Sequence, residues 1–124
     1  MIDVKGKKVF LSGPMSNDPE TYHAHDFIDA HIKLNAMEAL FVYDPAIEWL
    51  TRDVDECDKP HDYWMRRCLT ELTKPDFSSW YKPRYDLFIS LPGWKGSAGA
   101  TTERHVAGAC GIPCVDWDEV IDEA

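Results

Sequence analysis

The sequence has no apolar run near the roughly 20 residues that a membrane-spanning helix requires. Its first residues are charged and do not resemble a signal peptide, so we expect a cytoplasmic protein with no membrane partner. Basic residues are also scarce, since 13 Lys and Arg face 22 Asp and Glu. A protein that coats DNA or RNA needs a basic face, so we expect no polynucleotide partner. A small phosphorylated ligand is compatible with this charge, because a turn of backbone amides binds an anion locally.

The sequence also lacks a CxxC pair, zinc-ligand spacing and an HExxH motif. We therefore expect no metal site, no cofactor and no disulfide framework. The cysteines are predicted to be small buried apolar residues. They are Cys57, Cys68, Cys110 and Cys114.

Strand and helix patterns alternate along all 124 residues, which we interpret as one domain, residues 1–124. This alternation predicts an α/β fold, a small flavodoxin-like three-layer sandwich with a mostly parallel sheet of four or five strands. The segment 75–83 is predicted to be a loop or insertion, anchored by its aromatic side chains. Strands are expected at 8–12, 40–43, 85–91 and 112–115. Helices are expected from Asp18–Pro19 to about Glu38, from Asp44–Pro45 to about Leu50, and at 61–74, 98–111 and 118–122.

The stretch from Leu91 to Glu103 has the pattern of a strand, a glycine-bearing turn and a helix N-terminus, a common way to hold an anionic group. Glu103 is its unusual residue. Its helical neighbours at i−4, i+3, i+4 and i+7 are small or apolar, so its carboxylate is predicted on the inward face. A carboxylate rarely faces a core, and above Gly99 it is expected to face a cleft. Ser97 fits both an N-cap and a hydroxyl donor to a phosphate or sugar oxygen.

Two more turns are expected at the same edge, because ligands of parallel sheets bind outside the carboxyl ends of the strands. One turn follows the first strand, and the other begins at Asp44. Asp86 lies at the opposite end of its strand, where a structural role is expected, and His31 is expected to be a satisfied core histidine. The first turn contributes Gly13, Pro14, Met15 and Ser16 as candidate ligand contacts.

These motifs together resemble the nucleoside 2-deoxyribosyltransferase superfamily, and most closely a small branch common in phage and bacterial genomes. The resemblance rests on Phe10 to Met15, on Tyr43-Asp44-Pro45-Ala46, and on Leu91-Pro92-Gly93-Trp94 through Ser97-Ala98-Gly99-Ala100 to Glu103. It spans most of the chain.

The resemblance implies that Glu103 is a nucleophile that attacks C1′ of a (deoxy)nucleoside and displaces the base. A second base or water then resolves the glycosyl-enzyme. Ser97 lies six residues before Glu103, where nucleotide-hydrolysing relatives hold the 5′-phosphate, so a 5′-monophosphate is the expected substrate. Trp94 or Trp64 is expected either to stack on the base or to pack in the core or an interface. The resemblance also implies a homodimer or larger homo-oligomer.

One position departs from this pattern. Relatives carry an aspartate on the helix before the third strand, and Cys68 stands there instead. A thiol is a poor replacement for a carboxylic acid as a proton donor. Either the local chemistry differs, or Asp62 or another acid substitutes, or the protein binds a nucleotide without turning it over. A flavodoxin-like partner domain without a ligand is the third reading.

Overall fold

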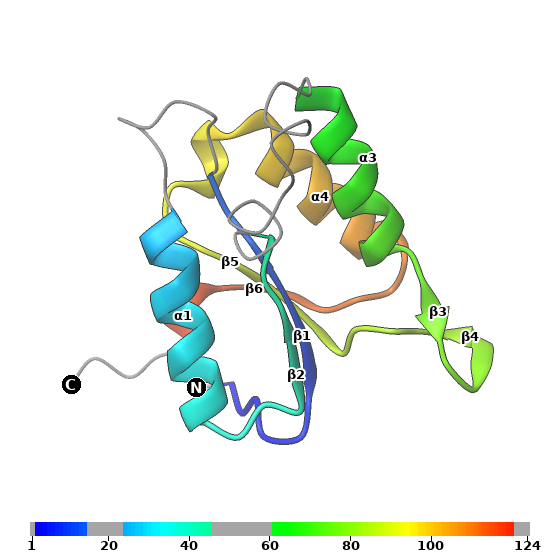
Figure 1. The fold of residues 1–124 in the computed structure, drawn as a ribbon. Coiled ribbons are helices and arrows are strands. Elements are labelled where there is room, and N and C mark those ends of the chain that lie inside the picture. The colour runs from blue at the N-terminus through cyan, green and yellow to red at the C-terminus, as the bar shows by residue number, and fades with distance from the viewer. Residues whose placement is uncertain (1, 15–23, 46–60, 121–124) are drawn as a thin grey trace, which may run out of the picture.

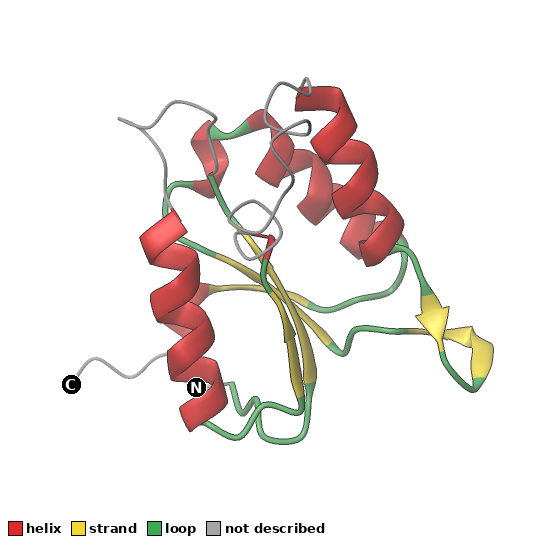
Figure 2. Ribbon diagram, in the orientation of Figure 1, coloured by secondary structure: helices red, strands yellow, loops and turns green. Residues whose placement is uncertain are grey.

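The computed structural model describes residues 2–14, 24–45 and 61–120, and its elements are drawn in Figures 1 and 2. None of the helices in these ranges combines the length and the apolar content that a bilayer span requires. The strands are β1 Lys8–Ser12, β2 Phe41–Tyr43, β3 Pro75–Asp76, β4 Ser79–Pro83, β5 Leu87–Ser90 and β6 Cys114–Asp116. The helices are α1 Ala24–Ala36, α3 His61–Leu72 and α4 Ala98–Ala109, with single 3-10 turns η2 Trp94–Gly96 and η3 Trp117–Glu119.

The main sheet has four parallel strands in the order β2-β1-β5-β6. Helix α1 lies on one side of this sheet, and α3 and α4 lie on the other (Figure 1). The α/β prediction of a small flavodoxin-like sandwich with a parallel sheet is therefore confirmed. Because the chain goes from β1 to β2 in one direction and then to β5 and β6 in the other, the strand order reverses between β1 and β5. Such a switch point opens a crevice at the carboxyl ends of the strands.

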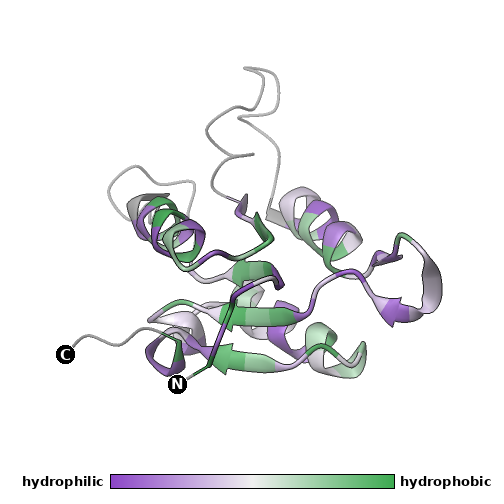
Figure 3. Ribbon diagram, turned by 90° about the horizontal axis from the view of Figure 1, so that it is seen from below, coloured by the Kyte–Doolittle hydropathy of each residue, from purple (hydrophilic) through white to green (hydrophobic). Residues whose placement is uncertain are grey.

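The central strands are buried on both faces, which explains their nearly continuous apolar sequence (Figure 3). Alternate residues of each strand enter two separate cores, because successive side chains point to opposite faces. On the α1 side, Val9, Leu11 and Ile89 pack with Phe27 and Leu34.

The core beneath α3 and α4 is built around the ring of Phe10. This ring stacks on Tyr43 at 4.8 Å and on Phe88 at 5.5 Å between centroids, and it meets Tyr85 edge-on at 5.4 Å. Ala107 of α4 and the other members of the cluster close this layer. Aromatic pairs of this geometry add to the free energy gained from burial alone, so this face holds α3 and α4 firmly on the sheet.

The segment 75–83 differs from the prediction. It is not an irregular loop but an antiparallel hairpin of β3 and β4 that projects from the main sheet (Figure 1). Its aromatic side chains are not anchors, because Phe77, Trp80 and Tyr81 are 82%, 88% and 98% exposed. Trp80 and Tyr81, which favour strands, lie in β4, and among the described residues no apolar surface covers them. The hairpin is instead fixed at its base, where Lys8 pairs with Asp76 at 2.9 Å.

The cysteine prediction is wrong for Cys110, which is exposed just after α4, while Cys68 and Cys114 are half-buried. None of these three forms a disulfide, and Cys57 lies outside the described residues. Asp86 has the structural role expected of it, since its carboxylate accepts a hydrogen bond from the backbone N–H of Lys8 at 3.0 Å.

Gly13, in the turn after β1, lies against Leu91, the residue that follows β5. A Cβ built on Gly13 would lie 2.9 Å from Cβ of Leu91, an atom that cannot swing away. We therefore expect Gly13→Ala to lower the free energy of unfolding by about 1–3 kcal/mol through overpacking. Urea denaturation measures this change.

Gly108→Ala is the matched control for that experiment. Gly108 lies within α4, and a Cβ there would meet nothing within 4 Å. Alanine should stabilise this helix by about 0.5–1 kcal/mol, because glycine loses more backbone entropy on folding. Equal effects at the two positions would contradict a close approach at Gly13.

Candidate functional site

Glu103 is 6% exposed and lies on the inward face of α4, at the carboxyl edge of the sheet. The hydroxyl of Ser12, the last residue of β1, donates to its Oε1 at 2.9 Å. Ser12 is fully buried. The helical spacing therefore predicted correctly which way Glu103 points, and the structure adds the strand residue that holds it. Within the described residues this carboxylate has a single neutral donor, and its burial is costly because hydrogen bonds to water are lost.

Burial raises the pKa of Glu103 from 4.5 to about 7, and the hydrogen bond from Ser12 opposes part of that rise. The carboxyl group is therefore divided between its acid and its anion near neutral pH. Perturbed carboxyl groups of this kind are concentrated at functional sites, because nucleophiles and general acids need a pKa close to the working pH.

Ser97 caps α4, as predicted. Its side-chain oxygen accepts a hydrogen bond from the backbone N–H of Ala100 at 3.2 Å. The hydroxyl hydrogen of Ser97 is not consumed by this bond, so it can still donate to an oxygen of a ligand. The positive end of the α4 dipole lies at the same place. Gly99 follows in the first turn of the helix, four residues before Glu103.

Two of the three turns predicted at this edge of the sheet, those of Pro14 and Gly93, do meet. Gly93 has a φ of +88°, and a Cβ there would lie 3.2 Å from Cγ of Pro14. Glycine is needed at this position both for the left-handed backbone and for the close approach. Pro14 itself is half-buried at the end of the described part of the turn. Met15 and Ser16 lie outside the described residues.

Asp44 follows β2 at the same edge of the sheet but belongs to its other face. Phe10 and Tyr43 pair in register and share a face with Ser12, so Asp44 points to the α1 side. There its buried carboxylate lies 3.2 Å from Nδ1 of His31, a residue of α1. The histidine has a partner, as predicted, although its ring is partly exposed rather than fully in the core.

A cluster of polar side chains next to Glu103 was not predicted from the sequence. Ser12, Ser90 and Asp116 stand in register at the ends of β1, β5 and β6. Arg104 donates to Ser90 Oγ at 2.9 Å and to Asp116 Oδ1 at 2.8 Å. Glu103 therefore bonds to the end of β1, and the next residue, Arg104, bonds to the ends of β5 and β6. The available signal was that each of these buried strands ends in a small polar residue.

Trp94 belongs to the same polar cluster. Its indole N–H donates to Asp116 Oδ1 at 3.1 Å, and the guanidinium of Arg104 lies 4.4 Å from the indole centroid. A pocket of about 280 Å³ adjoins the indole and is also lined by Lys95 and Trp117. The other tryptophan considered for base stacking, Trp64, lies on α3, where it meets Tyr63 edge-on at 5.1 Å.

Cys68 is half-buried and packs against the aromatic core beneath α3. The alternative acid, Asp62, is exposed and pairs with Arg66 at 3.0 Å. The hydrogen bond from Arg66 lowers the pKa of Asp62. Because a lowered pKa favours the anion, Asp62 is a weak proton donor in this position.

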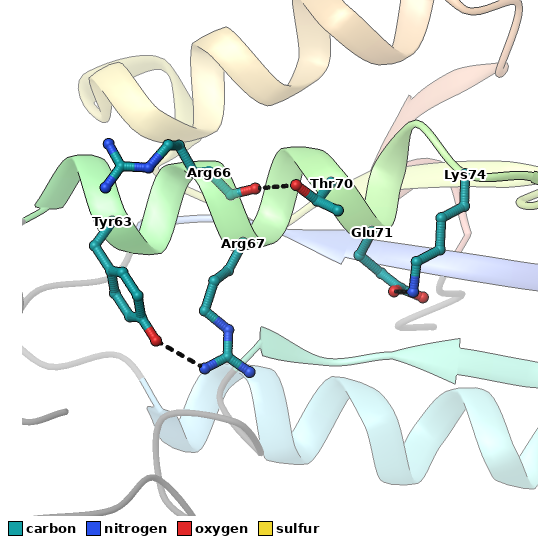
Figure 4. A pocket seen from close by; sticks show the side chains of 6 residues that line it. All are labelled: Tyr63, Arg66, Arg67, Thr70, Glu71 and Lys74. Atoms are coloured by element: carbon teal, nitrogen blue, oxygen red, sulfur yellow. Dashed lines mark hydrogen bonds and ion pairs between the residues drawn. The ribbon is translucent and has the colours of Figure 1, made fainter. Parts of the chain in front are cut away.

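A groove of about 330 Å³ runs along the outer face of α3 (Figure 4). Lys74 pairs with Glu71 at 2.6 Å, while Arg66 and Arg67 leave the lining with a net positive charge. Arg67 donates to the hydroxyl of Tyr63 at 3.2 Å, and Thr70 donates to the backbone oxygen of Arg66 (Figure 4). The one acid among its lining residues, Glu71, is therefore paired with a lysine, and this lining offers no buried carboxylate comparable to that of Glu103.

Comparison with curated proteins and with solved structures gives no match. A scan against protein-family models matches residues 7–116, which include both β1 and β6 and the whole of the site around Glu103. The match covers most of the chain. The protein therefore belongs to the family described as a domain of unknown function, DUF4406.

Proposed function

We propose that this protein cleaves or exchanges the N-glycosidic bond of a (deoxy)nucleoside 5′-monophosphate, with Glu103 as the nucleophile. The observation that carries the proposal is the buried carboxylate of Glu103, held by Ser12 at the switch point of a parallel sheet. Burying a carboxylate destabilises the folded protein, so a chemical role explains why a carboxyl group lies at this position.

In the first step, a carboxylate oxygen of Glu103 forms a bond to C1′ of the sugar while the C1′–N bond breaks. The electron pair leaves with the base, which takes up a proton from water. In the second step, water or a second base attacks C1′, and the carboxylate of Glu103 is released. Water gives up a proton in this step, so the hydrolytic reaction balances. The negative charge of Glu103 stabilises the oxocarbenium-like transition states of both steps.

The N-terminus of α4 supports the choice of a phosphorylated substrate. Ser97 and backbone N–H groups of the first turn offer donors to a phosphate, and the helix dipole favours its charge. Glu103 lies six residues beyond Ser97, which is about 1.7 helical turns or roughly 9 Å of rise, and this suits a ligand that extends from a phosphate to a sugar carbon. In this proposal Ser97 binds the phosphate and Glu103 attacks the sugar carbon of the same ligand, as the resemblance implies.

The test is to incubate the protein with a panel of ribo- and deoxyribonucleoside 5′-monophosphates and the matching nucleosides. Chromatography then measures the free base. We expect base release from at least one monophosphate and less from its nucleoside. Release from none of them overturns the proposal.

A nucleotide-binding module without turnover is the second candidate. It is favoured by the packing of Cys68 in the aromatic core, where relatives are expected to carry an acid. Titration calorimetry separates the two functions. Binding of a nucleotide with no base release, retained in Glu103→Gln, identifies the module.

The pH dependence of the proposed reaction follows from the pKa of about 7 for Glu103. The nucleophile must be ionised, so kcat/KM should rise with pH and level off above about 7, with a tenfold change per pH unit on the acid side. Ser12→Ala removes the hydroxyl that lowers this pKa, so its acid limb should move to higher pH. A profile that is flat from pH 5 to 8, or a limb unmoved in Ser12→Ala, would contradict the role of Glu103.

A further inference from the structure

The hairpin of β3 and β4 leaves a large apolar surface uncovered. We call residues 74–84 the aromatic arm, because Phe77, Trp80 and Tyr81 are all more than four-fifths exposed. An isolated two-stranded hairpin is at best marginally stable in water. The arm is attached at its base through Lys8 and Asp76, and the guanidinium of Arg84 lies 4.0 Å from the ring centroid of Phe77. The side chains of Trp80 and Tyr81 remain at the surface.

The size of this surface fits an interface between proteins. An aromatic side chain buries about 150–250 Å² when it is covered, so covering the arm would remove roughly 500 Å² from water. A standard interface buries about 800 Å² on each partner. The arm alone therefore supplies more than half of one side of a stable interface.

The charge of the arm is opposite to that of the rest of the chain. The arm holds three Lys and Arg against one acid, whereas the whole chain holds 13 against 22. Its one acid, Asp76, is paired with Lys8 and its Lys74 is paired with Glu71, so Lys82 is left as an exposed cation next to Tyr81. The partner best matched to a basic aromatic arm is an acidic surface with an apolar floor.

Such a surface lies on this same chain. A pocket of about 290 Å³ between α1 and η3 has an apolar floor that includes Leu91, Pro92 and Trp117. Its rim carries three carboxylates and one lysine. We call it the acidic pocket, and the rim residues are Asp26, Asp29, Asp118 and Lys33.

We propose that the aromatic arm of one copy docks in the acidic pocket of a second copy. The arm projects from the end of the molecule opposite to α1 (Figures 1 and 3), so the contact cannot form within one chain. Two copies that exchange arms reciprocally form a closed dimer, and a contact made in one direction only, when repeated, produces a ring or an open chain of protomers. This inference does not depend on the proposed reaction.

Two surface variants test the contact. Trp80→Ser/Tyr81→Ser removes the two most exposed aromatic side chains of the arm and leaves the pocket intact. Asp29→Lys/Asp118→Lys reverses the charge of the rim and leaves the arm intact. Light scattering during size-exclusion chromatography should give an assembly larger than a monomer for the wild type and a monomer for each variant. Ile32→Ser, which replaces another exposed apolar side chain, should assemble as the wild type does.

Mixing the two variants is the decisive experiment. Each pair then has one intact arm and one intact pocket, so the mixture should give a dimer that grows no further. Circular dichroism confirms that each variant is folded, and added salt should weaken the wild-type assembly, because its charges are exposed. A monomeric wild type, a pocket variant that still assembles, or a mixture that stays monomeric overturns the proposal. An assembly that survives only in the pocket variant would indicate that arms pair with each other.

Discussion

Glu103→Gln should abolish the release of free base from a nucleoside 5′-monophosphate, lowering kcat by about 10³-fold or more, the scale observed when a nucleophile is removed. Glutamine has nearly the same shape and can still accept the hydrogen bond from Ser12. The loss would therefore report the missing nucleophile rather than a changed fold. Chromatographic measurement of free base against time, at pH 8, gives the rate for both proteins.

Glu71→Gln is the matched control for this variant. Glu71 also accepts hydrogen bonds, from Tyr85 and Lys74, but it belongs to α3 and lies outside the proposed site. It should keep the wild-type rate. Equal rates for the wild type and Glu103→Gln would refute the role of Glu103 as nucleophile, and binding of the nucleotide by both without turnover would point to the binding module.

The same substitution should make the protein more stable above pH 7. The pKa of Glu103 is about 7 in the folded protein and about 4.5 when it is exposed, so the folded state holds a proton that the unfolded state has lost between these values. The free energy of unfolding of the wild type therefore falls as pH rises from about 4.5 to 7. The expected difference between Glu103→Gln and the wild type is roughly 3 kcal/mol at pH 8, and it disappears near pH 4.

Urea denaturation at several pH values measures this difference. Glu71→Gln again gives the contrast, because hydrogen bonds from Lys74 and Tyr85 outweigh burial and lower the pKa of Glu71. Its substitution should therefore destabilise the protein at neutral pH, and the effect should diminish as pH falls through the folded pKa. A Glu103→Gln variant that is no more stable than the wild type at pH 8 would mean that the carboxylate is well solvated in the folded protein.

These two expectations concern one residue and are independent of each other. A stabilised and inactive Glu103→Gln would show that the fold carries a costly carboxylate for the sake of its chemistry, a trade-off common at active sites. A stabilised variant with no activity to lose would support a binding role. The pair of measurements therefore remains informative whichever function the protein has.

Much of the architecture follows from local patterns. Continuous apolar runs predicted β1, β5 and their parallel neighbours, since strands covered on both faces need no polar side. The helical spacing around Glu103 predicted the direction of its side chain, and Ser97 was predicted as the N-cap of α4. Each of these conclusions depends on residues within about two helical turns of one another.

The predictions that failed needed information from distant parts of the chain. The pattern of 75–83 predicted a loop with anchoring aromatic residues, yet whether Trp80 is covered depends on where the hairpin points. Cys110 was expected to be buried, but its exposure is decided by the end of α4 and not by its chemistry. The partners of Arg104 are 12 and 14 residues away on two different strands.

The sequence by itself determined the parallel α/β fold, the turns at its carboxyl edge and the unusual placement of one glutamate. Periodicity and turn chemistry are local, and they do not depend on how the sheet is ordered. Only the tertiary structure decided that Ser12 and Glu103, 91 residues apart, share a hydrogen bond, while Asp44 faces the opposite side. Strand order and register set these distances, and with them the burial that raises the pKa of Glu103 to about 7. That burial turns an unusual residue into a candidate for catalysis.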